Sequence, residues 1–261
     1  MAAYYNEIDP YAAQWLRNLI KGGHIAPGDV DERSIEDVHP DDLRPYTQCH
    51  FFAGIGIWSL ALRRAGWPDS RPVWTGSCPC QPFSTAGAGA GFDDKRHLWP
   101  DFHWLIRERR PVLVFGEQVA SKAGLAWLDL VQADLGREGY AFGCADICSA
   151  GAGSENGRQR LYFVADTNSQ RQPRRAQQNS SALESCESAP RWNHAGGCSQ
   201  NALFAAELVV GASGESRLLE PGTVPLVAGY PTLLERLRAY GNGLNVEAAT
   251  QFIGAYLDAT T

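Results

Sequence analysis

The stretch HFFAGIGIWSLALRRAG, residues 50–66, decides the fold, because a short apolar run broken by two glycines passes there into a helix. VWTGSC, residues 73–78, is typical of a second buried strand. Apolar residues at helical spacing predict a helix over residues 98–110, and Pro111 opens the apolar strand VLVF. Strands that alternate with helices of this length predict an α/β fold with a doubly wound, mainly parallel sheet.

The same pattern extends to both sides of this stretch. Helical spacing and short apolar runs predict further helices at 11–21, from Leu125 to Leu135 and at 245–258, and further strands at 140–147 and 161–165. After residue 165 the composition changes. Residues 166–200 contain a single residue from the set Ile, Leu, Val, Met and Phe, namely Leu183, so we expect a long loop there.

The composition limits the class of protein. Hydrophobic residues at 44% and charged residues at 20% are typical of a globular protein, and no apolar run approaches the length of a membrane span. The N-terminal residues have no basic and apolar regions of a secretory signal, so we expect a cytoplasmic protein. The net charge of −6 argues against indiscriminate coating of nucleic acid, although a local basic face remains possible.

The seven cysteines are irregularly spaced and are expected to be free thiols. A zinc site among Cys144, Cys148, Cys186 and Cys198 fits no standard ligand spacing, so no metal is expected. Two arginine clusters are interpreted as solvated surface, namely Arg107, Arg109 and Arg110, and Arg171, Arg174 and Arg175.

The sharpest chemical signal is GSCPCQPFS, residues 76–84, directly after a predicted strand. Ligand sites open at the carboxyl ends of strands in α/β sheets, and a loop stiffened by Pro79 can present Cys80 to a substrate. A thiol in such a place becomes a nucleophile when its pKa is lowered or a partner is positioned beside it. A buried thiol in a stiff turn would be the alternative for this string alone.

This string resembles the proline-cysteine-glutamine motif of the phage and bacterial cytosine-5 DNA methyltransferases, and further strings match that family in its order. They are Phe52-Ala53-Gly54-Ile55-Gly56, Glu117-Gln118-Val119 after a predicted strand, Asn156-Gly157-Arg158-Gln159-Arg160 before the strand LYFVA, and Gly241-Asn242-Gly243. A lone G-x-G is weak, but the set covers residues 47–165 and 236–258. The resemblance implies a Rossmann-like methyltransferase fold, S-adenosylmethionine as cofactor and double-stranded DNA as partner of a monomer.

The resemblance also implies roles for individual residues. Cys80 would attack C6 of a flipped-out cytosine, and Glu117 would bind the N3 and amino group of that base. Arg160 would hold its O2, with Arg158 supporting the site. The implied cofactor contacts are Phe52, Ala53, Gly54, Ile55, Gly56, Glu7, Ile8, Asp29, Val30, Pro79, Leu98, Asn242 and Gly243.

One feature departs from the family. Phe52 and Cys80 are 28 residues apart, which leaves room for one helix but not for the two further cofactor-binding strands of the family. YNEIDPYA from Tyr5 and Gly28-Asp29-Val30 resemble those strand ends, so we expect residues 1–46 to supply displaced strands ahead of the glycine loop. An unrelated helical cap would be the alternative.

The expected organisation is a catalytic and cofactor-binding domain at 1–165, a target-recognition region at 166–235, and a segment at 236–261 that returns to the first domain. Gln118, Asn156 and Ser59 depart from the usual motif residues, and Ser59 disfavours a dinucleotide cofactor. Two other functions remain open at this point. One is methylation of RNA by a similar architecture, and the other is a catalytically silent protein that binds cofactor and DNA.

Overall fold

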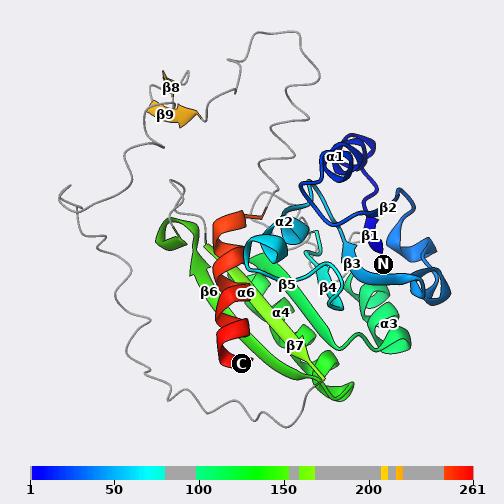
Figure 1. Ribbon diagram of the computed structural model, residues 1–261. Helices are drawn as coiled ribbons and strands as arrows, with labels where there is room; N and C mark the ends of the chain where they lie inside the picture. The colour runs from blue at the N-terminus through cyan, green and yellow to red at the C-terminus, as the bar shows by residue number, and fades with distance from the viewer. Residues whose placement is uncertain are drawn as a thin grey trace, which may run out of the picture. The chain divides into compact units, whose positions relative to one another are not determined.

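The computed structural model describes residues 2–79, 98–152, 159–167, 207–210, 216–219 and 244–260 (Figure 1). The chain divides into two compact units, Met1–Pro173 with Glu235–Thr261, and Arg174–Leu234. In the second unit the described residues form one antiparallel hairpin, of β8 (Glu207–Val210) and β9 (Ser216–Leu219). No described helix has the length and apolar character needed to cross a membrane.

The first unit is built on a seven-stranded sheet of order β2-β1-β3-β4-β5-β7-β6. Five neighbouring strands are parallel, β7 runs antiparallel to β5, and β6 runs antiparallel to β7. The predicted α/β fold with a mainly parallel sheet is therefore confirmed. The strands are β1 (Ala2–Asn6), β2 (Gly28–Asp31), β3 (Tyr46–Phe51), β4 (Val73–Gly76), β5 (Leu113–Val119), β6 (Ala141–Cys148) and β7 (Gln159–Asp166).

Helices cover both faces of the sheet (Figure 1). On one face lie α1 (Pro10–Lys21), α2 (Ile57–Arg64) and α6 (Val246–Thr260), and on the other lie α3 (Trp99–Arg109) and α4 (Lys122–Arg137). Side chains alternate between the faces along each strand, so Phe115 packs with α2 and α6 while its neighbour Val114 packs with α3 and α4. Both faces are thus buried, as in a doubly wound sheet.

The first two strands of the chain extend the sheet beyond β3. β1 lies between β2 and β3 and pairs with both in parallel. Past the ends of these strands, the Ala53 N–H donates to the Asn6 carbonyl at 3.0 Å and the Glu7 N–H donates to the Asp31 carbonyl at 3.0 Å. Residues 2–46 therefore share the sheet and its core, since Tyr5 and Leu16 are completely buried against the face that carries α1.

Three strand boundaries differ from the sequence-based expectation. Glu117 and Gln118 lie inside β5 rather than after it, and Arg160 lies inside β7 rather than before it. The reason is the backbone pairing of β5 with β7, which continues through Glu117 with Tyr162 and through Val119 with Arg160. Similarly, β2 runs on to Asp31, so Asp29 is not the last residue of its strand.

Candidate functional site

The carboxyl ends of β1, β3, β4 and β5 meet at one edge of the sheet, because these strands are parallel neighbours. β7 runs in the opposite direction, so its amino end lies at the same edge. Ligand sites of open α/β sheets form at this edge. The described residues that the topology brings there are Glu7, Phe52, Ala53, Gly54, Ile55, Gly56, Ser77, Cys78, Pro79, Glu117 and Arg160.

The loop between β3 and α2 is held in an unusual backbone conformation. Phe52, Gly54 and Gly56 have φ values of 52°, 54° and 80°, in the left-handed region that favours glycine. Gly56 is the N-cap of α2, and its N–H donates to the Ala53 carbonyl at 2.9 Å. Among the described residues, a methyl group added at Gly54 would meet no atom within 4 Å, so this part of the structure leaves the backbone there uncovered.

Glu7 reaches this loop from the end of β1. Its Oε2 accepts a hydrogen bond of 2.7 Å from the Gly54 N–H, and its Oε1 accepts one of 2.9 Å from the Asp9 N–H. Burial raises the pKa of the Glu7 carboxyl, and these two backbone donors oppose the rise. The carboxylate is therefore oriented by the backbone on one side, with acceptor capacity left for another donor.

The proposed cofactor residues in and after the first two strands have contrasting surroundings. Ile8 is 63% exposed, whereas Val30 packs partly into the core under α1. The Asp29 carboxylate accepts a hydrogen bond of 2.9 Å from the Tyr46 hydroxyl. The carboxylate at the end of β2 is instead that of Asp31, which the sequence analysis did not single out.

Asp31 belongs to a network at the end of β2. It accepts hydrogen bonds from the Tyr4 hydroxyl at 2.7 Å and from the Arg33 guanidinium at 2.7 Å. Burial acts to raise the pKa of Asp31, but the hydrogen bonds from Arg33 and Tyr4 and the charge of Arg33 together lower it. The Asn6 side chain donates to the Arg33 carbonyl at 2.8 Å, so the ends of β1 and β2 are fastened together beside Glu7.

Glu117 and Arg160 form an ion pair across β5 and β7. Arg160 Nε lies 2.6 Å from Glu117 Oε1, and the two side chains are only 13% and 11% exposed. Opposite charges this close together attract strongly in a largely water-excluded place. The pair also fixes where the remaining donors of the guanidinium and the remaining acceptors of the carboxylate can point.

The loop after β4 leads toward Cys80. Trp58 Nε1 on α2 donates to the Ser77 hydroxyl at 3.0 Å, Cys78 is buried, and Pro79 is half-buried. Burial raises the pKa of the Cys78 thiol, which disfavours its thiolate and its use as a nucleophile. Cys80 itself lies outside the described residues, as do Arg158, Asn242 and Gly243.

Other predicted features are placed as follows. Leu98 is half-buried at the start of α3 and packs against the core on that face. The described cysteines, Cys49, Cys78, Cys144 and Cys148, are free thiols, and no cluster of three metal-ligating side chains occurs in the described part of the chain. Arg107 and Arg110 are paired with Glu108 and Glu138. They lie at the end of α3, next to the amino end of β5 and away from Glu117.

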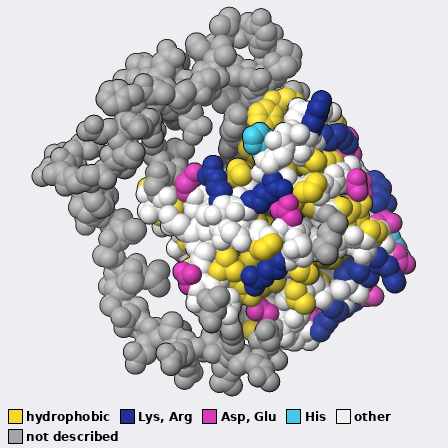
Figure 2. All heavy atoms as spheres, in the orientation of Figure 1, with side chains coloured by type: hydrophobic (Ala, Val, Ile, Leu, Met, Phe, Trp, Pro, Cys, Tyr) yellow, Lys and Arg dark blue, Asp and Glu magenta, His cyan; other side chains and the backbone are white. Residues whose placement is uncertain are grey.

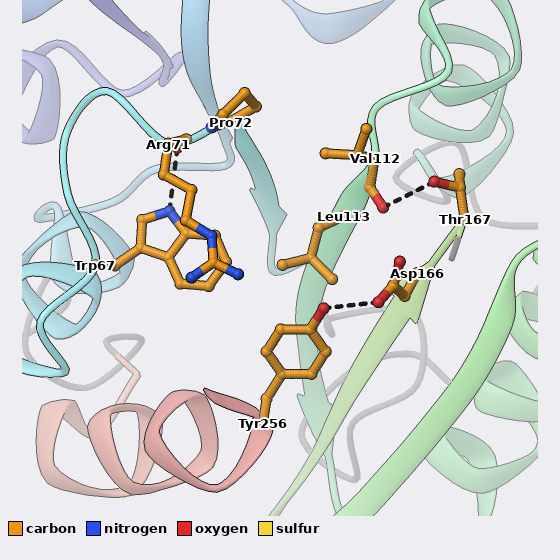
Figure 3. Close-up of a pocket in the computed structure, with 8 residues that line it drawn as sticks. All are labelled: Trp67, Arg71, Pro72, Val112, Leu113, Asp166, Thr167 and Tyr256. Atoms are coloured by element: carbon orange, nitrogen blue, oxygen red, sulfur yellow. Dashed lines mark hydrogen bonds between the residues drawn. The ribbon is translucent and has the colours of Figure 1, made fainter. Parts of the chain in front are cut away.

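Charged side chains of both signs lie on the visible face of the described residues. Figure 2 shows Lys and Arg side chains interspersed with Asp and Glu side chains over the face in view. A hollow of about 440 Å³ lies among Trp67, Arg71, Pro72, Val112, Leu113, Asp166, Thr167 and Tyr256 (Figure 3). The hollow lies at the amino ends of β4 and β5 and the carboxyl end of β7, which is the edge of the sheet opposite Glu117, and Tyr256 reaches it from α6.

The chain is similar in sequence to known methyltransferases. The family model described as C-5 cytosine-specific DNA methylase matches residues 67–195. Type II methyltransferase M.HhaI of Haemophilus parahaemolyticus is 32% identical over 94 residues, which are 34% of this chain and 29% of that protein. Type II methyltransferase M.NlaX of Neisseria lactamica is 25% identical over 169 residues, which are 63% of this chain and 44% of that protein.

The solved structures that the chain resembles are methyltransferases of lower sequence identity. A DNMT2 mutant of Spodoptera frugiperda has a TM-score of 0.44 at 16% identity and covers 65% of this chain and 44% of its own. The Dnmt2 methyltransferase of S. pombe has a TM-score of 0.40 at 18% identity, with 64% and 42% covered. The matched parts span less than half the length of the curated relatives.

Proposed function

We propose that this chain, which resembles the C-5 cytosine-specific DNA methylases over residues 67–195, is a DNA cytosine-5 methyltransferase. It transfers a methyl group from S-adenosylmethionine to C5 of a cytosine in double-stranded DNA. The observation that carries the proposal is the meeting of three groups at one edge of the sheet. These are the glycine loop with Glu7, the loop that leads to Cys80, and the buried Glu117–Arg160 pair.

Cytosine C5 is a poor nucleophile, so the reaction needs covalent activation at the adjacent carbon. In the proposed mechanism the Cys80 thiolate adds to C6, and the electron pair of the C5–C6 double bond becomes available at C5. S-adenosylmethionine, when bound, supplies the electrophilic methyl group. A base then removes the C5 proton, the C5–C6 double bond reforms, and the Cys80 thiolate leaves.

Glu117 and Arg160 act on the opposite side of the ring in this proposal. The Glu117 carboxylate accepts from the amino group and from N3 as N3 takes up a proton during attack at C6, and Arg160 donates to O2, so that charge developing on the ring is stabilised. The 2.6 Å contact between the two side chains supports a joint role, because one planar base edge can meet both at once. Arg158 is proposed to support them.

The chain's own residues suit a bound sulfonium cofactor at the neighbouring strands. The Glu7 carboxylate is held beside the glycine loop and retains acceptor capacity for the two ribose hydroxyls. The open backbone at Gly54 allows a ligand to approach closely. The proposed set is completed by Ile8, Asp29, Val30, Pro79, Leu98, Asn242 and Gly243. Asp29 lies two residues before the end of β2, so its proposed contact with the adenine has the least support from the strand geometry.

The DNA side of the proposal concerns the rest of the chain. The target base must leave the duplex, because neither face of a stacked ring is reachable by Cys80. Residues 166–235 are the proposed target-recognition region of a cytoplasmic monomer. Residues 1–165 and 236–261 form the proposed catalytic part.

The experiment is transfer of labelled methyl groups from S-adenosylmethionine to duplex DNA and, in parallel, to tRNA. The proposal expects label in DNA that is resistant to removal of RNA, and bisulfite sequencing of the product then gives the target site. Label in tRNA alone would assign an RNA methyltransferase. Cofactor binding without transfer to either polymer would favour a catalytically silent protein. Cys80→Ala is the control that abolishes transfer without touching the described core.

A further inference from the structure

Trp58 contacts the loop after β4 and, on β5 and β7, the two aromatic rings Phe115 and Tyr162 that neighbour the Glu117–Arg160 pair. It lies in the first turn of α2, two residues after Gly56 of the glycine loop, and its side chain is 5% exposed. Its position on the sheet side of α2 places the indole between β4, β5 and β7. Such a ring can pass a displacement of one loop on to another, because buried side chains are close-packed.

The indole has one polar group, and that group binds the loop after β4. Trp58 Nε1 donates to Ser77 Oγ at 3.0 Å. An indole N–H can only donate, and a buried donor without an acceptor is costly, so this contact holds the ring and the loop in register. Ser77 directly follows β4 and precedes Cys80 by three residues.

The apolar part of the ring packs on the strands that carry the ion pair. The Trp58 and Phe115 rings are stacked at 6.1 Å, and the Tyr162 ring meets Trp58 edge-on at 6.1 Å. Phe115 lies two residues before Glu117 on β5, and Tyr162 pairs with Glu117 across the sheet. The Trp58 ring therefore connects the Ser77 loop, through direct contacts, with the parts of β5 and β7 that carry Glu117 and Arg160.

We propose that Trp58, through its hydrogen bond to Ser77, is a positioning residue that sets the loop leading to Cys80 relative to the Glu117–Arg160 pair. The inference rests on the proposed function. The nucleophile must stand within about 3–3.5 Å of C6, and a misplacement of about 1 Å can cost roughly a hundredfold in rate. A single hydrogen bond that fixes the base of the loop can therefore affect the attack on C6 far more than it affects folding.

The test uses the full chain and measures the rate of the covalent adduct with duplex DNA containing 5-fluorocytosine. Ser77→Ala removes the acceptor and leaves the indole in place. We expect at least about a tenfold slower adduct at saturating DNA, with an unchanged dissociation constant for S-adenosylmethionine. Ser77→Thr keeps the hydroxyl and is expected to restore most of the rate.

A matched control is available on the opposite edge of the sheet. Trp67 Nε1 donates to the Arg71 carbonyl at 3.1 Å, and Trp67 is 2% exposed and also packs on Phe115. Trp67→Phe and Trp58→Phe each remove one buried indole N–H. Trp58→Phe is expected to slow the adduct as Ser77→Ala does, whereas Trp67→Phe should lower Tm without slowing it.

The outcomes separate this inference from the proposed function. A wild-type chain that forms no adduct overturns the proposed function and this inference with it. A wild-type chain that forms the adduct, together with a Ser77→Ala variant that forms it equally fast, overturns the positioning role alone. Equal slowing by Trp58→Phe and Trp67→Phe would also overturn it, since general destabilisation would then explain the loss.

Discussion

The Glu7 carboxylate accepts a hydrogen bond of 2.7 Å from the backbone N–H of Gly54, a residue 47 positions later in the chain. This contact joins the end of β1 to the glycine loop that follows β3. The N–H of Asp9 binds the other carboxylate oxygen at 2.9 Å. Two backbone donors thus fix the direction of the carboxylate before a ligand binds. The Glu7 side chain therefore loses less conformational entropy on binding.

Replacement of Glu7 by alanine is expected to weaken the binding of S-adenosylmethionine. The variant loses hydrogen bonds to a charged acceptor worth roughly 1.5–3 kcal/mol, which is about a ten- to hundredfold rise in the dissociation constant. Isothermal titration calorimetry gives that constant directly. Glu32→Ala is the matched control, because Glu32 is exposed and pairs with Arg17 instead. An unchanged affinity in Glu7→Ala would remove β1 from the proposed cofactor site.

Cys80 is expected to form a covalent adduct with duplex DNA that contains 5-fluorocytosine. Fluorine at C5 blocks the final elimination, so the Cys80–C6 bond persists and shifts the protein on a denaturing gel. Cys78→Ala should retain the adduct, because burial raises the pKa of Cys78 and its thiol faces the core. Equal trapping by Cys80→Ala and the wild type would refute the assignment of the nucleophile.

Arg160→Lys is expected to separate catalysis from stability at the ion pair. Lysine keeps the positive charge beside Glu117, but it lacks the planar fork that can hold a carboxylate and a base oxygen together. We expect turnover to fall on the order of a hundredfold or more, while the melting temperature stays near that of the wild type. Arg110→Lys is the control, since Arg110 pairs with Glu138 at 2.7 Å on the opposite edge. A loss of activity in proportion to unfolding would contradict this role.

Arg160→Ala is expected to behave differently from the lysine variant. It leaves the Glu117 carboxylate largely buried without the guanidinium, and breaking a buried pair costs up to about 3–5 kcal/mol. Urea unfolding should show that loss, and Glu117→Gln in the same chain should recover part of it. An Arg160→Ala variant as stable as the wild type would show that the pair contributes little to folding.

His50 is expected to make the fold less stable in acid. It is 1% exposed on β3, its Nδ1 lies 2.8 Å from Thr75 Oγ1, and burial lowers its pKa from 6.5 to about 3. Below pH 6.5 the unfolded chain takes up a proton that the folded chain does not, so stability is present above that pH and falls as the pH is lowered toward 3.

The slope contributed by His50 is about 1.4 kcal/mol per pH unit in that window. Urea unfolding at a series of pH values measures it, and the difference between wild type and His50→Phe isolates it from the acidic groups. His24→Ala changes an exposed histidine and should keep the slope. Parallel pH profiles for wild type and His50→Phe would contradict a neutral, buried His50.

The sequence predicted best those elements that show a clear local period. The helix expected at 11–21 is observed at Pro10–Lys21, and the helix expected at 98–110 is observed at Trp99–Arg109. The predicted extent of β5 was wrong. Polar residues such as Glu117 do not continue the apolar run of the strand, and they belong to β5 only because they pair with β7. Strand ends set by a partner strand cannot be seen in one segment alone.

The candidate site divides in the same way. Motif residues such as Gly54, Glu117 and Arg160 could be named from the sequence, since each belongs to a short string that resembles a motif of the cytosine-5 DNA methyltransferases. The contacts of Trp58 with Ser77 and of Asn6 with Arg33 had no such signal. They join segments that only the folded sheet brings together. The assignment of β1 and β2 to the cofactor strands of the family stays a prediction.

The packing of α6 on α2 affects how the protein is made in the cell. Arg64 on α2 pairs with Glu247 on α6 at 3.1 Å across 183 residues, and the same interface buries Trp58 and Phe115. On the ribosome, this apolar face has no cover until α6 leaves the exit tunnel. Contacts of such long sequence separation close a large loop, so we expect this part of the core to form late in folding.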